Sequence, residues 1–203
     1  MYRKKRGFTI VEMLMVIAVL AVLMGIVSTA ASSVIRKSRV RKNQALQSAL
    51  QAGIATYYQQ EGFWPPGKKG ALQKFADNGL DQKDRGSGIA TLDDSGYDAL
   101  MSFLVTRCLT ASGNKVMDVS GFTAVRKSAT AAKEGNGLPK CSGEEVKSWV
   151  AKLKASNAHG SVPQASEMTF GYTHSDKGHF RRFVIKYNAE TDTVAVEFAK
   201  DGK

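Results

Sequence analysis

The sequence predicts an α+β fold in which a long N-terminal helix packs on a small C-terminal antiparallel sheet with extra helices. Two observations predict the helix: residues 8–27 are apolar except at Thr9 and Glu12, and no proline occurs before Pro65. A third observation predicts the sheet, because the last third of the chain alternates or clusters β-branched and aromatic residues. The chain has 203 residues, which allows one modest domain in addition to the helix.

The N-terminal helix is expected to run from about Phe8 to Glu61, a length on the order of 80 Å. Phe8 to Val27 alone would cross about 30 Å of hydrocarbon. We expect the helix to end with Gly62 just beyond its last turn and Pro65 shortly after. We therefore divide the chain into four parts: residues 1–7, a leader; 8–28, the apolar half of the helix; 29–61, its amphipathic half; and 62–203, a globular head.

The amphipathic half of the helix should pack against the head along one stripe. Its apolar residues recur at helical spacing, which is typical of a face that contacts a core. The stripe consists of Leu46, Leu50, Gly53, Ile54, Tyr57 and Tyr58.

Helices are also expected within the head. A short one is expected near Leu72–Asn78, inside a surface loop that spans residues 67–95. A second covers 97–108, with Asp94 or Ser95 as its N-cap. The core-facing positions of this second helix are Leu100, Phe103 and Leu104.

The last helix should open at Ser142. Ser142 and Glu145 have the spacing of a capping box, in which each side chain bonds the other's backbone N–H. We expect this helix to continue to about Ala155, after a loop that holds residues 112–140. Its inward residues are expected to be Val146, Trp149, Val150 and Leu153.

Two or three antiparallel strands follow. Three segments carry the β pattern, and the residues from Asn188 to Asp192 form a hairpin connection between the last two. Packed against the amphipathic stripe, these strands would complete an α+β ladle, with the long helix as handle and the sheet as bowl. The strands are expected at Met168–Tyr172, Arg182–Tyr187 and Thr193–Phe198.

A basic leader, a glycine and an isolated acid precede the apolar run. Positive charges at 3–6 favour a cytoplasmic leader. Gly7 lacks a Cβ, so an extended chain there can enter a narrow protease cleft. Glu12 is the only ionisable residue between Gly7 and Arg36, and a carboxylate at the centre of a membrane helix costs roughly 2.5–3.5 kcal/mol on insertion scales. Glu12 therefore indicates a role beyond anchoring.

Residues Arg6-Gly7-Phe8-Thr9-Ile10-Val11-Glu12 resemble the leader junction of type IV prepilins and of the pseudopilins of type II secretion. The resemblance covers about the first 55 residues. It implies that a prepilin peptidase in the inner membrane cuts between Gly7 and Phe8 and methylates the amine of Phe8. It implies that Glu12 then acts in assembly with other pilin or pseudopilin subunits on an inner-membrane platform. The head would be periplasmic and the assembled filament would span the periplasm.

Two details bear on the subtype. Tyr57-Tyr58-Gln-Gln-Glu-Gly62-Phe-Trp64-Pro65 resembles the end of the stem helix in the family and favours a secretion pseudopilin over an adhesive pilin. Many members also have a proline within the stem, which this chain lacks, so no kink is assigned to the helix.

The spacing supports a role for Glu12 in pairing. After cleavage the amine of Phe8 would lie four residues from Glu12, so the carboxylate could face its own N-terminus or that of a neighbour. Two alternatives remain: an uncleaved signal anchor in which Glu12 reaches the headgroups, and a secretory signal peptide removed after Ala31.

Cations also follow the apolar run. The leader's four cations account for four of the +11 formal charges, so cleavage would leave +7. This second group could meet anionic headgroups, acidic side chains of adjacent subunits or solvent; nucleic acid is less favoured, because no aromatic residues interleave with the cations. The group consists of Arg36, Lys37, Arg39, Arg41 and Lys42.

The two cysteines, Cys108 and Cys141, would form one disulfide in an exported domain, with two buried thiols as the alternative. No CxxC pattern is present, and a metal site on the three histidines is not expected.

Two groups of aspartates raise the question of calcium, which some major pseudopilins bind in the head. Neither group has the spacing of an EF-hand loop, and solvated turns are the favoured interpretation. No cofactor is therefore expected. The groups are Asp77, Asp81 and Asp84, and Asp93, Asp94 and Asp98.

No catalytic motif is present: the sequence lacks Gly-x-Ser-x-Gly, a phosphate loop and a paired His-Glu motif. We therefore expect a structural filament subunit rather than an enzyme. The alternatives are a membrane-anchored exported binding domain and a DNA-uptake competence pilin.

Overall fold

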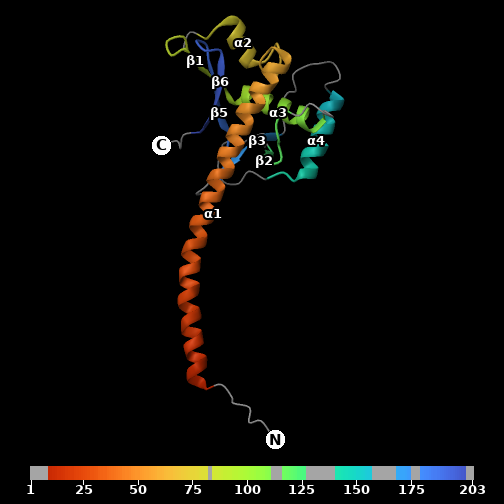
Figure 1. Ribbon diagram of the computed structural model, residues 1–203. Helices are drawn as coiled ribbons and strands as arrows, with labels where there is room; N and C mark the ends of the chain where they lie inside the picture. The colour runs from red at the N-terminus through yellow and green to blue at the C-terminus, as the bar shows by residue number, and fades with distance from the viewer. Residues whose placement is uncertain are drawn as a thin grey trace. The chain divides into compact units, whose positions relative to one another are not determined.

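The computed structural model describes residues 9–81, 84–110, 116–126, 140–156, 168–174 and 179–199, without the side chains of 27–30, 110 and 153–156. The chain divides into two compact units, Met1–Arg41 and Lys42–Lys203. The boundary falls inside the first helix, α1 (Ile10–Glu61), so the last third of this helix belongs to the same unit as the head. Figure 1 labels the elements.

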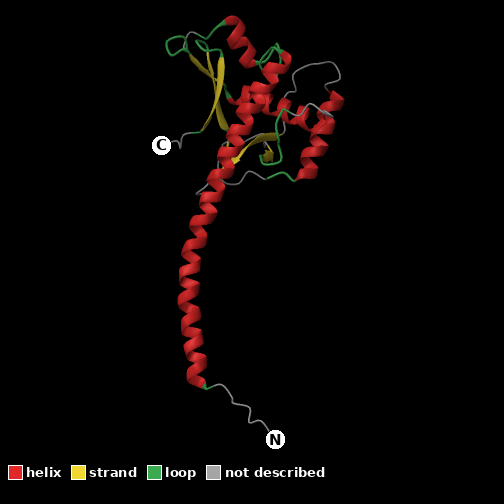
Figure 2. Cartoon of the chain, in the orientation of Figure 1, coloured by secondary structure: helices red, strands yellow, loops and turns green. Residues whose placement is uncertain are grey.

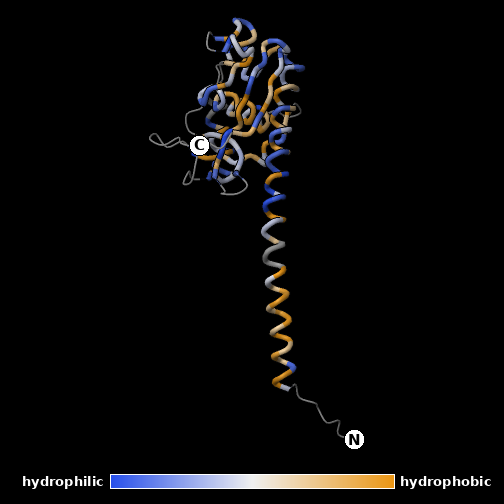
Figure 3. Tube along the Cα trace, turned by 90° about the vertical axis from the view of Figure 1, so that its left-hand side faces the viewer, coloured by the Kyte–Doolittle hydropathy of each residue, from blue (hydrophilic) through white to orange (hydrophobic). Residues whose placement is uncertain are grey.

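The N-terminal unit consists of the first part of α1. Its large apolar side chains are exposed wherever the structure describes them, from Ile10 at 81% to Val40 at 39%. Figure 3 shows the apolar stretch of α1 in orange, followed by a hydrophilic stretch in blue. By length and composition α1 is able to cross a membrane. An exposed apolar surface of this length marks a contact with lipid or with another protein.

The predicted stripe is buried in the second unit. Leu50 and Ile54 are at most 1% exposed, and Tyr57 is 3% exposed. Gly53 approaches the segment that follows α3, because a Cβ at Gly53 would lie 2.9 Å from the sulfur of Met117. This part of α1 therefore forms one wall of the head's core, as the periodicity predicts.

The C-terminus of α1 is also as predicted. Gly62 follows the helix with φ +74°, a left-handed conformation that glycine adopts without a Cβ penalty. Its N–H donates to the carbonyl of Tyr58 at 2.8 Å. The helix therefore stops where the chain turns towards Trp64 and Pro65.

Three shorter helices follow within the described residues: α2 (Ala71–Asn78), α3 (Asp94–Thr110) and α4 (Gly143–Ser156). The predicted N-cap of α3 is wrong, since Asp93 caps it: one carboxylate oxygen accepts the N–H of Gly96 at 2.8 Å. The predicted capping box of α4 is confirmed, with Ser142 N donating to Glu145 Oε2 at 2.7 Å and Glu145 N to Ser142 Oγ at 3.2 Å.

The part of the head that the structure describes contains two small antiparallel sheets, where the sequence predicts one (Figure 2). One sheet has the order β1-β5-β6 and the other β2-β3-β4. Within the first, β5 and β6 pair from Phe183–Phe198 to Asn188–Thr193, which confirms the predicted hairpin. The strands are β1 (Ile89–Thr91), β2 (Thr123–Arg126), β3 (Met168–Thr173), β4 (Phe180–Arg181), β5 (Phe183–Asn188) and β6 (Thr193–Phe198).

Strands β1 and β2 lie in segments predicted as loops. Both are too short to show a periodic pattern, at three and four residues. Each adds to the edge of a longer strand: Ala90 pairs with Tyr187, and Ala124 with Phe170. Tertiary pairing rather than local pattern therefore creates them.

Helix α3 lies at the centre of the head and packs against β3 and α4. The hydroxyl of Tyr97 in this helix forms hydrogen bonds with both sheets. Tyr97 Oη donates to the carbonyl of Phe170 in β3 at 2.7 Å and accepts the N–H of Phe183 in β5 at 3.4 Å. Leu100 and Leu104, both fully buried, fill the core beside it.

Two amides on α1 bond both sheets. Asn43 Nδ2 donates to the carbonyl of Thr173 in β3 at 2.9 Å, and Gln47 Nε2 donates to the carbonyl of Val196 in β6 at 2.6 Å. Asn43 and Gln47 are four residues apart, so they share one helix face. These bonds orient this part of α1 on the head in a way that apolar packing alone would not.

A buried ion pair lies where the chain passes from one sheet to the other. Arg182 separates β4 from β5 and is 6% exposed; Asp98 of α3 is 1% exposed. Arg182 Nε lies 3.4 Å from Asp98 Oδ1, and Thr169 Oγ1 donates to the same oxygen at 2.5 Å. Arg182 also reaches the exposed Asp94 at 3.3 Å. Two of the aspartates considered for calcium therefore bind a guanidinium.

Candidate functional site

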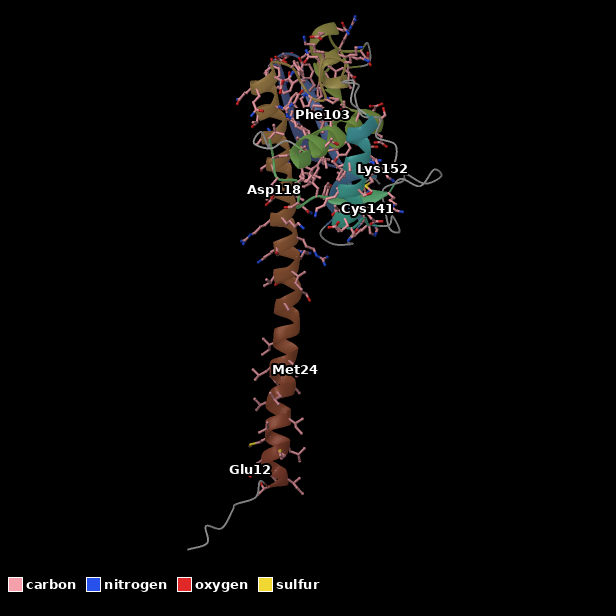
Figure 4. All side chains as sticks on the ribbon, turned by 90° about the vertical axis from the view of Figure 1, so that its right-hand side faces the viewer. Glu12, Met24, Phe103, Asp118, Cys141 and Lys152 are labelled. Atoms are coloured by element: carbon pink, nitrogen blue, oxygen red, sulfur yellow. The ribbon has the colours of Figure 1, made fainter. Side chains whose placement is uncertain are left out.

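The N-terminal turn of α1 holds the residues that the sequence singles out. Gly7 and Phe8 lie outside the described residues, and the structure begins at Thr9. Glu12 lies in the first turn, where the helix dipole favours a carboxylate (Figure 4). The predicted cleavage site is therefore next to the start of the described helix.

Thr9 and Glu12 form a capping box that the sequence analysis did not predict. Glu12 Oε2 accepts the Thr9 N–H at 2.8 Å and the Thr9 hydroxyl at 3.0 Å. Glu12 N donates to Thr9 Oγ1 at 3.3 Å. The pattern Thr-x-x-Glu directly before an apolar run was the available signature. In the uncleaved chain, Glu12 thus satisfies backbone and hydroxyl groups at the N-terminus of its own helix.

Among the described residues, both hydrogen bonds that the Glu12 carboxylate accepts from Thr9 go to Oε2 rather than to Oε1. The carboxylate can therefore hold the helix N-terminus through one oxygen and bind a cationic group through the other. Because exposed apolar side chains surround it, from Ile10 to Ile17, such a cation would come from outside this helix or from the chain's own N-terminus.

Residues 2–28 match the family model of the prokaryotic N-terminal methylation motif. The N-terminus is a prepilin-type methylation motif. The match is consistent with the type IV pilin-like family and supports processing as a prepilin, in a family whose members are structural rather than enzymatic. Comparison with curated proteins and with solved structures gave no match. The motif includes Gly7, Phe8 and Glu12, the residues selected from the sequence.

The two cysteines are free thiols in this structure. Cys108 is buried in α3, and Cys141 is half-buried just before α4. Burial, followed by the charge of Glu145, raises the pKa of the Cys141 thiol, while Arg126 opposes that shift. The disulfide stays a prediction of the sequence.

Several of the aspartates have structural roles. Asp93 caps α3, Asp98 binds Arg182, and Asp77 accepts from Gln73 at 2.7 Å. Within the described ranges, no group of three or more His, Cys, Asp or Glu residues could hold a metal ion. No cluster in this part of the chain therefore supports a calcium site.

An aromatic cluster around Asp192 is, like the Asp98–Arg182 pair, a polar feature of the head that the sequence does not predict. Asp192 accepts from the hydroxyls of Tyr187 at 2.9 Å and Tyr58 at 3.2 Å, and from Trp64 Nε1 at 3.2 Å. Tyr58 stacks on Trp64 with ring centroids 4.1 Å apart. The β5–β6 turn is thereby joined to the end of α1. Asp192 has φ +47°, a conformation that Asp tolerates better than most residues.

This cluster predicts a loss of stability at high pH. Burial, and then the hydrogen bond to Asp192 and its charge, raise the pKa of Tyr187 to about 12. The folded state favours the protonated hydroxyl of Tyr187. The contribution of this hydroxyl to the free energy of unfolding is therefore complete below pH ~10 and is lost as pH rises towards 12. We expect the free energy of unfolding to fall across this range. Urea denaturation of the full chain in micelles, followed by tryptophan fluorescence, measures it.

Tyr187→Phe isolates this contribution from other groups that titrate at the same pH. The difference in stability between the wild type and Tyr187→Phe should be constant below pH 10 and should shrink above it. Asp192→Asn should reduce the effect without removing it, because burial is the largest cause of the shift. Parallel curves for the wild type and Tyr187→Phe would contradict the assignment.

Proposed function

We propose that this protein is a pseudopilin, a structural subunit of a type II secretion filament or of a related type IV pilus. The match of residues 2–28 to the methylation motif carries the proposal. It is supported by the exposed apolar first half of α1, which a membrane or a bundle of identical stems would cover. The Tyr57–Pro65 segment, which closes on α1 through the Tyr58–Trp64 stack, favours the secretion type.

In this proposal the subunit reaches the filament in three steps: membrane insertion, processing and assembly. The leader cations keep residues 1–7 in the cytoplasm while residues 8–28 span the inner membrane and the head is periplasmic. Prepilin peptidase then cuts between Gly7 and Phe8 and methylates the new amine. Finally, Glu12 pairs with the Phe8 amine of a neighbouring subunit as the stems assemble on the inner-membrane platform.

Chemistry supports the pairing step. In the apolar core of a stem bundle, an isolated carboxylate is costly, and an ammonium group offsets that cost because opposite charges attract more strongly at low dielectric. A subunit in correct axial register places its amine beside a Glu12 carboxylate; a misplaced one leaves both charges unpaired. The pair would thus select the register in which subunits enter the filament.

The N-terminus of the mature protein tests the proposal. We expect mass spectrometry of the chain purified from membranes to show a chain that begins at Phe8 and carries one N-methyl group. Gly7→Leu should retain the leader, because a side chain is placed where the cleavage site needs a narrow backbone. Gly25→Ala is the matched control: a Cβ at Gly25 meets nothing within 4 Å, so processing should be unchanged. A mature chain that still starts at Met1, or one that starts after Ala31, would exclude the proposal.

A further inference from the structure

A ring of cations surrounds α1 after its apolar stretch. The ring is exposed at every position, and Figure 4 shows nitrogen-tipped side chains on both sides of this stretch of α1. A helix turns about 100° per residue. Measured from Arg36 and taken in chain order, the five side chains therefore point to about 0°, 100°, 300°, 140° and 240° around the helix axis. No face of the helix is therefore without a positive charge. The basic ring consists of Arg36, Lys37, Arg39, Arg41 and Lys42.

Acidic residues are absent from this helix between Glu12 and Glu61. Exposed helices usually alternate acids and bases, so that pairs three or four residues apart offset each other. Here no carboxylate of α1 lies within two turns of the ring. The ring is therefore a concentration of positive charge that the acids of its own helix do not offset.

The distance along the helix places the ring at a membrane surface. The uncharged stretch from Met13 to Ile35 contains 23 residues, about 34 Å of helix, and the hydrocarbon core of a bilayer is about 30 Å thick. Glu12 bounds this stretch at one end and Arg36 at the other. Because Cα–Cβ bonds tilt towards the helix N-terminus, the ring's side chains lean towards the bilayer.

We propose that the basic ring binds the anionic phospholipid headgroups of the leaflet on the head's side of the membrane. The ring geometry favours lipid over a protein or a nucleic acid, since a second macromolecule would contact one face of the helix, whereas a bilayer surrounds it. This inference depends on membrane insertion of the N-terminal helix and not on filament assembly. Its consequence is that the inserted subunit is held at a fixed depth until it leaves the bilayer.

Native mass spectrometry of the full chain tests the proposal. The chain is released from micelles that contain equal amounts of phosphatidylglycerol and phosphatidylcholine. We expect the wild type to retain phosphatidylglycerol preferentially, and the preference to decline as salt is raised. Each cation lost should lower it by up to about fivefold. With all five ring residues changed to Gln, the ratio of the two lipids should fall to the value that the leader cations alone support, which is about one for the chain that starts at Phe8.

A matched control removes the same charge elsewhere. In this control, five exposed lysines of the head are changed to Gln together, and the variant should keep its preference for phosphatidylglycerol. The five are Lys68, Lys69, Lys74, Lys147 and Lys152. Equal preference in the wild type and the ring variant would overturn the proposal, as would loss of preference in the control. Retention of a DNA duplex by the wild type without lipid preference would instead identify nucleic acid as the partner. Failure of Phe8 methylation would exclude the proposed function and leave this result unaffected.

Discussion

Asp98→Ala should lower the free energy of unfolding of the head by about 3–5 kcal/mol, the usual cost of breaking a buried ion pair from one side. The buried Arg182 guanidinium would lose the carboxylate that lies 3.4 Å from its Nε, while the exposed Asp94 would remain beside it. The total free energy of unfolding of a small domain is about 5–15 kcal/mol, so this loss is a large fraction of it. Trp64 and Trp149, both buried, provide the fluorescence for urea denaturation of the full chain in micelles.

Asp94→Ala is the matched control for this result. Its side chain contacts the same guanidinium but is 82% exposed, so its removal should cost less than about 1 kcal/mol. The double variant Asp98→Leu with Arg182→Met should recover much of the loss, because apolar replacement of a whole buried pair is often neutral. Equal losses for Asp98→Ala and Asp94→Ala would show that the ion pair does not behave as a buried one.

The helices and the hairpin were predictable because local features determine them. Gly62, the Ser142–Glu145 capping box and the stripe on α1 each depend on residues within one or two turns. The β5–β6 hairpin likewise joins adjacent segments. Strands β1 and β2 were not predictable, since each exists through pairing with a strand more than forty residues away.

Among the functional and polar features, too, the sequence predicts those that depend on nearby residues and not those that join distant segments. Glu12 stands out because one acid interrupts an apolar run, and the methylation motif includes it. The Asp192 cluster and the Asp98–Arg182 pair could not be predicted, because their members come from segments far apart in the chain. Asp98 was placed in an acidic group by sequence proximity, whereas its partners are Arg182 and Thr169, more than seventy residues later.

Glu12→Leu should leave membrane insertion intact and strongly impair filament assembly. Leucine is more favourable than glutamate in a membrane helix, so insertion cannot suffer from the change. Without the carboxylate, each neighbouring Phe8 amine would be buried in the stem bundle without a counter-ion. We expect the variant to appear in the membrane fraction, cleaved at Gly7–Phe8, with filament yield and stem-to-stem cross-linking reduced at least tenfold.

Thr9→Ala separates this pairing from the capping box. It removes the hydrogen bond that the Thr9 hydroxyl donates to Glu12 Oε2 and the one that it accepts from Glu12 N. The loss costs the helix about 1 kcal/mol, yet the Glu12 carboxylate stays in place. If Glu12 acts through the neighbour's amine, Thr9→Ala should assemble nearly as well as the wild type, and Glu12→Gln should fail almost as completely as Glu12→Leu, because an amide carries no charge. Filaments from Glu12→Leu at normal yield would reject the pairing. Equal failure of Thr9→Ala and Glu12→Leu would assign the role of Glu12 to the helix cap instead.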